Sequence, residues 1–178
     1  MLEKGSVDLI LSKPVSRFDL IIGKYFGGIF MVFINIGYLI IGLWFLIGIK
    51  FGVWELDFLL TIFTITYAFA TLYSLIILIG ILTRSSVLVM MISYIIFFIL
   101  SPILAARDTI SLISNSKIIS VTLDILYYLI PQTSDMGELT TNLAVGGGIG
   151  SSESIYISAL FIILTLGVSI FIFNKKDY

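Results

Sequence analysis

Residues 25–49 read YFGGIFMVFINIGYLIIGLWFLIGI, and none of these 25 side chains carries a charge. Three further charge-free runs follow at residues 58–83, 85–106 and 154–174, with lengths of 26, 22 and 21 residues. A helix of roughly 20 apolar residues crosses the hydrocarbon core of a bilayer, which is about 30 Å thick. Charged residues bound each run, as expected if charge must remain in water. The sequence therefore predicts an all-α, polytopic membrane helical bundle with four transmembrane helices.

The composition agrees with this fold class. Hydrophobic residues make up 59% of the chain and charged residues only 12%, and the mean hydropathy is +1.16. An ordinary soluble domain contains about 25% charged residues. Lipid must therefore solvate part of the apolar surface. The net charge of −1 gives no electrostatic basis for binding nucleic acid.

The residue types also exclude several chemistries. The chain has no cysteine and no histidine, which excludes disulfides, thiol chemistry, Cys/His zinc sites and imidazole catalysis. Gly23-Lys24-Tyr25 lacks the spacing and hydroxyl residue of a phosphate-binding loop. The charge-free runs hold no side chain that could couple transport to protons. We expect no cofactor, no metal and no catalytic residue, and a membrane enzyme is the least favoured class.

Lysine and arginine predict the orientation. Four spans place both termini on one side of the membrane, and with both termini inside, seven basic residues face inward and three face outward. This bias favours cytoplasmic termini in the cell membrane. We expect one membrane domain, residues 1–178, with a cytoplasmic segment at 1–24 and an extracytoplasmic segment at 107–153. The inner residues are Lys4, Lys13, Arg17, Lys24, Arg84, Lys175 and Lys176, and the outer ones are Lys50, Arg107 and Lys117.

The leading segment, residues 1–24, predicts a short helix before the first span. Residues 5–12 place three apolar side chains on one helical face, and Pro14 prevents the helix from continuing. Ser16 is expected to cap the next helix, with Asp19 three residues later completing the pattern. The apolar face consists of Val7, Ile10 and Leu11.

The outer segment contains one further apolar stretch, residues 118–130. It is too short to cross the bilayer, and Asp124 at its centre would cost about 2.5–3.5 kcal/mol there. We therefore expect a re-entrant or interfacial helix that ends at Pro131. Residues 146–150 are rich in glycine and are expected to form a flexible connection to the last span.

Few polar side chains lie within the predicted spans. Asn35 could contact a transported substrate or hydrogen-bond a neighbouring helix, and the second interpretation is favoured. Gly23 and Gly27 form a GxxxG spacing that permits close helix packing, although this spacing is common by chance. Hydroxyl residues in the second span could line a polar seam, but bonds to carbonyls of their own helix are favoured. These residues are Thr61, Thr64, Thr66, Thr71 and Ser74.

The leading segment resembles the cytoplasmic segment of ABC-2 type transporter permeases. The resemblance extends to the later layout, with close-set helices, an Ile-Pro turn at Ile130-Pro131 and the pair Ser134-Asp135 in the outer segment. The matching positions are Glu3, Gly5, Ser12, Pro14, Val15, Ser16, Arg17, Gly23 and Lys24.

The resemblance implies a membrane permease subunit of an ATP-binding cassette exporter. Such a subunit pairs with a second copy or a homologous half, and a separate ABC ATPase docks on its coupling segment. Without the resemblance, the short helix would be interpreted as lying on lipid. The implied coupling residues are Gly5, Val7, Leu9, Ile10, Leu11, Pro14, Ser16 and Arg17.

Members of that family carry two membrane helices before the coupling segment, so we expect upstream DNA to encode two more apolar spans. The alternative function is a small membrane scaffold or assembly protein that moves no substrate. A neighbouring gene for an ABC ATPase would discriminate between the two functions.

Overall fold

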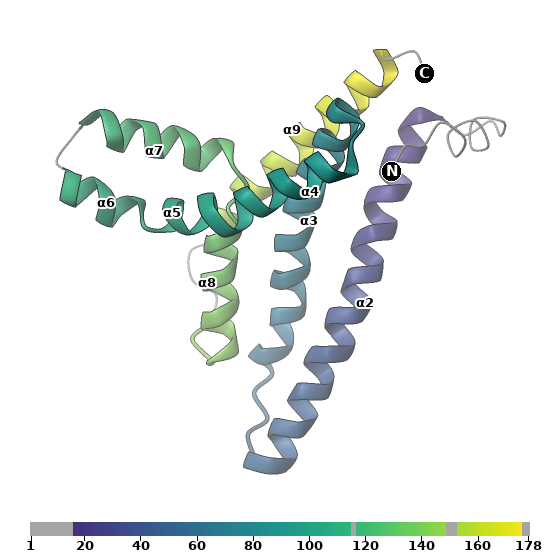
Figure 1. Ribbon diagram of the computed structural model, residues 1–178. Helices are drawn as coiled ribbons and strands as arrows, with labels where there is room; N and C mark the ends of the chain where they lie inside the picture. Colours follow the sequence, from purple (N-terminus) through teal and green to yellow (C-terminus); the bar gives the residue numbers. More distant parts are fainter. Residues whose placement is uncertain (1–15, 115–116, 149–152, 176–178) are drawn as a thin grey trace.

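The computed structural model describes residues 16–114, 117–148 and 153–175. Over these residues every regular element is a helix, and the structure is 89% helical. Four described segments are long and apolar enough to cross a membrane, which confirms the predicted all-α polytopic bundle (Figure 1). The elements are α2 (Arg17–Phe51), α3 (Asp57–Thr83), α4 (Ser86–Tyr94), the π-helix η1 (Ile95–Leu100), α5 (Ser101–Ala105), α6 (Arg107–Ser114), α7 (Lys117–Leu129), α8 (Thr133–Ala144) and α9 (Glu153–Lys175).

Helix α2 begins directly after Ser16, as the sequence predicts. The Ser16 hydroxyl oxygen accepts a hydrogen bond from the Asp19 backbone N–H at 3.0 Å, and the hydroxyl donates to the Asp19 carboxylate at 2.6 Å. The helix has 35 residues. At 1.5 Å per residue it is about 52 Å long, which exceeds the hydrocarbon thickness of about 30 Å. The first turns of α2, residues 17–24, therefore extend the membrane helix beyond its charge-free run.

A tight turn joins α2 to α3. Gly52 adopts the left-handed conformation with φ of 72°, and its N–H donates to the Gly48 carbonyl at 2.9 Å. The Trp54 ring packs on Gly48 so closely that a Cβ there would lie 2.6 Å from a ring carbon. The Trp44 indole N–H donates to the Glu55 carbonyl at 2.9 Å. Two glycines and two tryptophans thus hold the hairpin closed.

Helix α3 is the centre of the bundle, because it packs against α2, α8 and α9 (Figure 1). On the α2 side, the Tyr25 hydroxyl donates to the Ala70 carbonyl at 3.2 Å, and its ring stacks on Tyr73 with centroids 6.0 Å apart. The buried apolar cluster between α2, α3 and α9 consists of Ile21, Tyr25, Ala70, Ile77, Ile81, Leu166 and Phe173.

The hydroxyl side chains of α3 bond to their own helix, as predicted. All five donate to a carbonyl three or four residues earlier, at distances from 2.6 to 3.2 Å. Two of them also accept a hydrogen bond from another helix. Thr64 accepts from Thr140 of α8 at 2.8 Å, and Ser74 accepts from Thr165 of α9 at 2.9 Å. The hydroxyls of α3 therefore bond to carbonyls of their own helix, and two of them also link α3 to α8 and α9.

The third span is not a uniform α-helix. At the end of η1 the Ser101 N–H bonds the carbonyl of Ile96, five residues back. The next residue, Pro102, has no N–H, so this part of the helix lacks a donor and is a natural place for irregular geometry. The helix nevertheless continues to Ala105, close to the end of the predicted span at residue 106. The span leaves α3 after its first turns and leads away from it (Figure 1).

The outer segment holds three helices among the described residues, where the sequence predicted one. Helix α7 matches the predicted helix before Pro131, and with α6 it forms a hairpin that projects from the bundle (Figure 1). Helix α8 instead packs on α3. The buried side chains of α8 recur every three or four residues, a helical pattern that the sequence analysis missed. They are Thr133, Met136, Leu139 and Leu143.

The contact of α2 with α3 gives a test of the packing. A Cβ on Gly28 would lie 2.8 Å from Cζ of Tyr73, whereas a Cβ on Gly27 would meet no atom within 4 Å. We expect Gly28→Ile to lower the free energy of unfolding by about 1–3 kcal/mol because it forces the two helices apart. Thermal unfolding in detergent measures this change. Gly27→Ile is the matched control, and an equal loss in both variants would contradict the observed packing.

Candidate functional site

Most of the predicted coupling residues lie outside the described residues. These are Gly5, Val7, Leu9, Ile10, Leu11 and Pro14. The two described members, Ser16 and Arg17, lie at the start of α2, within the leading segment. The start of α2, the turn between α3 and α4, and the end of α9 all lie at one end of the bundle, which we name the terminal end (Figure 1).

Arg17 connects the start of α2 to the last turn of α9. Its Nη1 donates to the carbonyl of Phe173 at 3.0 Å and to that of Asn174 at 3.4 Å. The guanidinium carbon also lies 5.8 Å from the centroid of the Phe173 ring. The last carbonyls of a helix have no partner within the helix and carry the negative end of its dipole, so a cation is favoured there. The side chain that begins α2 therefore stabilises the end of α9.

The helices beneath Arg17 are packed together. Ile21 of α2, Ile81 of α3 and Phe173 of α9 belong to one buried cluster, and the three side chains are 3%, 6% and 5% exposed. A displacement of the start of α2 must therefore be shared by α3 and α9, because close-packed interiors transmit strain.

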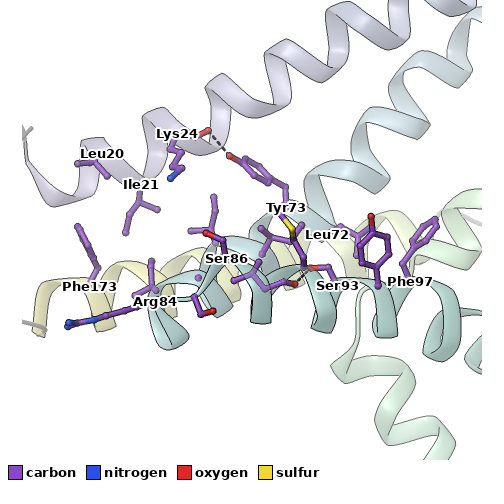
Figure 2. A pocket seen from close by; sticks show the side chains of 18 of the residues that line it. Leu20, Ile21, Lys24, Leu72, Tyr73, Arg84, Ser86, Ser93, Phe97 and Phe173 are labelled. Carbon is purple, nitrogen blue, oxygen red and sulfur yellow. Dashed lines mark hydrogen bonds between the residues drawn. The ribbon is translucent and has the colours of Figure 1, made fainter. Parts of the chain in front are cut away.

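A groove of about 470 Å³ opens beside this packed end, between α2, α3 and the α4–η1 segment (Figure 2). Its lining is aliphatic and aromatic along most of its length. Two cations, Lys24 and Arg84, line it together with the hydroxyl residues Ser85 and Ser86. The sequence analysis missed this groove, because it exists only where the third span leaves α3.

The residues proposed for a pathway or for helix packing lie on α2. The Asn35 side chain is exposed, and its amide donates to the Met31 carbonyl of the same helix at 2.7 Å. Gly23 and Gly27 are also exposed, and a Cβ on either would meet no atom within 4 Å. The structure does not bring these three residues together with another described helix, and their role remains a prediction. The glycine in close contact with α3 is Gly28.

A second polar cluster joins α7, α8 and α9. The Tyr127 hydroxyl donates to the Asp135 carboxylate, which also accepts from the Ser154 hydroxyl at 3.2 Å. The Arg107 guanidinium lies 3.4 Å from the centroid of the Tyr127 ring. Burial, followed by the hydrogen bond to Asp135 and its charge, raises the pKa of Tyr127 to about 12. The phenol therefore stays protonated and keeps donating at all physiological pH values.

Two more hydrogen bonds extend the cluster towards α5. The Ser101 hydroxyl lies 2.6 Å from the hydroxyl oxygens of both Thr133 and Ser134. Among the described residues no group of His, Cys, Asp and Glu side chains could hold a metal ion. The cluster therefore connects α5, α7, α8 and α9 through side-chain hydrogen bonds.

The four span-length helices define a polytopic helical membrane protein. A polar segment precedes its first charge-free run. The sequence matches the family described as ABC-2 family transporter protein over residues 2–178. The chain belongs to this family, and the resemblance that the leading segment indicates is confirmed. A comparison with curated proteins and with solved structures found no match.

The polar cluster gives a test with a matched control. We expect Tyr127→Phe to lower the free energy of unfolding by about 1.5–3 kcal/mol, because it removes a hydrogen bond to a charged group. Tyr128→Phe is the control, since that neighbouring side chain is 61% exposed. Unfolding by a denaturing detergent measures both variants. Unchanged stability of Tyr127→Phe would show that the bond to Asp135 contributes nothing.

Proposed function

We propose that the chain is the membrane permease subunit of an ATP-driven exporter, powered by a separate ABC ATPase. Family membership supports the permease role. The observation that carries the coupling mechanism is the bond from Arg17 to the last turn of α9. The ATPase, the export direction and the pairing with a second copy or a homologous half belong to the proposal.

In the proposed mechanism, closure of the ATPase on bound ATP displaces the leading segment. The apolar residues Leu9, Ile10 and Leu11 contact the ATPase, and Pro14 separates their helix from α2. Movement of Ser16 and Arg17 then acts on α2 directly and on α9 through the Arg17 hydrogen bonds. Rigid-body movement of packed helices is an established way to convert a local displacement into a change of access.

Docking and transmission can be tested separately. We expect replacement of Leu9, Ile10 and Leu11 by aspartate to abolish association with the ABC ATPase encoded nearby, measured by pull-down. Arg17→Gln should preserve association but reduce stimulation of ATP hydrolysis by substrate, since α9 loses its connection to α2. Lys50→Gln is the matched control at the other end of α2.

Retained association of the aspartate variant would remove the docking role. Equal stimulation in Arg17→Gln and Lys50→Gln would remove the transmission role. If no ABC ATPase associates with the unaltered chain, the alternative function, a membrane scaffold, would be favoured.

The proposed topology places the terminal end in the cytoplasm of the cell. Arg17, Lys24, Arg84 and Lys175 all belong to segments at this end, whereas Lys50 lies at the opposite end of α2. This distribution follows the preference of basic residues for the cytoplasmic face.

The native chain has no cysteine, so single cysteines can report the topology. Leu56 in the α2–α3 turn is 69% exposed, and Asn174 in the last turn of α9 is also exposed. We expect a membrane-impermeant maleimide to label Leu56→Cys in intact cells and to label Asn174→Cys only after permeabilisation. The reverse pattern would contradict cytoplasmic termini.

A further inference from the structure

The groove at the terminal end combines a charged end with a long apolar wall. On the α4–η1 side the wall remains open to the surroundings of the bundle. Met90, Tyr94, Phe97 and Phe98 line the groove and are 62%, 64%, 47% and 64% exposed. In a membrane helix such surfaces face hydrocarbon chains, so the groove opens to lipid rather than to water.

Lys24 provides the charge. It is half-buried, and no carboxylate pairs with it among the described residues. Its side chain projects from α2 into the groove, on the side that faces the start of α4 (Figure 2). Burial of a cation without a partner of opposite charge is costly. A negatively charged ligand in the groove would remove this cost.

The other lining residues favour an anion at the same end. Arg84 adds a second positive charge, and the lining contains no aspartate or glutamate. Ser85 caps α4, so the positive end of the α4 dipole lies beside the groove as well. The favoured ligand therefore carries negative charge at the terminal end and apolar groups beyond it.

The groove is long enough for an acyl chain of one membrane leaflet. Its lining follows the third span from Ser86 to Phe98. At 1.5 Å per residue this is about 20 Å, roughly two-thirds of the hydrocarbon thickness of about 30 Å. The volume of 470 Å³ also falls within the range of roughly 300–1,000 Å³ that is usual for ligand sites.

We propose that this groove binds one anionic phospholipid of the leaflet at the terminal end. Its phosphate lies between Lys24 and the start of α4, and an acyl chain runs along α4 and η1 towards Phe97. The site requires neither the ATPase nor the proposed export direction, so its test is independent of both.

Native mass spectrometry of the purified full chain tests the charge. We expect the first molecule of dioleoylphosphatidylglycerol to bind about fivefold more tightly than dioleoylphosphatidylcholine, the usual effect of one basic residue at a lipid surface. Lys24→Gln should remove most of this preference, and Lys50→Gln should retain it. Equal effects of the two substitutions, or no preference in the unaltered chain, would overturn the proposal.

A second pair of matched variants tests the apolar wall. Met90 lines the groove and is 62% exposed, whereas Met91 is 56% exposed and lies outside the lining. Met90→Trp should weaken binding of both lipids at least fivefold by filling the groove, and Met91→Trp should not.

Two other occupants would give different results. If Met90→Trp leaves lipid binding unchanged but alters the ratio of monomer to dimer, the groove is an interface with a second copy and the proposal fails. If glycerol phosphate competes fully with the phospholipid, the site recognises the headgroup alone, and the acyl-chain part of the proposal is wrong.

Discussion

The absence of water in the hydrocarbon region is the constraint on which this structure depends, because each polar group there must find its partner within the protein. Helix α3 meets this constraint with hydroxyls that bond to its own carbonyls. Some of these hydroxyls then accept hydrogen bonds from neighbouring helices, as Ser74 does from Thr165 at 2.9 Å. Two tyrosines add hydrogen bonds to carbonyls across helices, from Tyr25 to Ala70 at 3.2 Å and from Tyr67 to Ile155 at 2.7 Å. Interhelical hydrogen bonds of this kind select neighbours where apolar contact alone gives little preference.

These hydrogen bonds also show the structural role of α8 in the outer segment. Ser74 contacts α9, but Thr64, ten residues nearer the start of α3, contacts Thr140 of α8. Ile155 in the first turn of α9 accepts a hydrogen bond from Tyr67 of α3, so these bonds join α9 to α3 at Tyr67 and Ser74, and α8 to α3 at Thr64. Asp135 in the first turn of α8 accepts a hydrogen bond from Ser154 in the first turn of α9. The positive ends of both helix dipoles therefore lie near one carboxylate, which stabilises the junction.

Much of the fold could be predicted from the sequence, because the length of a hydrophobic run and the position of the charges around it indicate which segments cross the bilayer. The four spans, the cap at Ser16 and the back-bonding of the α3 hydroxyls all follow from local patterns. What the sequence could not predict depends on contacts between distant residues. The contact of Arg17 with Phe173 requires two helix ends to meet, and the groove beside Lys24 requires the third span to leave α3. Helix α8 had a local signal, the recurrence of Met136, Leu139 and Leu143, but its 12 residues are too few to cross the bilayer and so give no hydrophobic run of span length.

The charge-free spans constrain how the proposed exporter could move. With no charged group inside them, the proposed change of access is driven from the helix ends. Helices α2 and α3 contain no proline, and α2 is continuous over 35 residues, so the proposed displacement at Arg17 would be transmitted along the length of α2. The third span is different, since the π-helix before Pro102 makes it the more deformable element. A stiff hairpin beside a deformable span changes shape mainly where the two face each other. That place is the groove beside Lys24, so the lipid proposed there would be sensitive to the motion in the proposed mechanism.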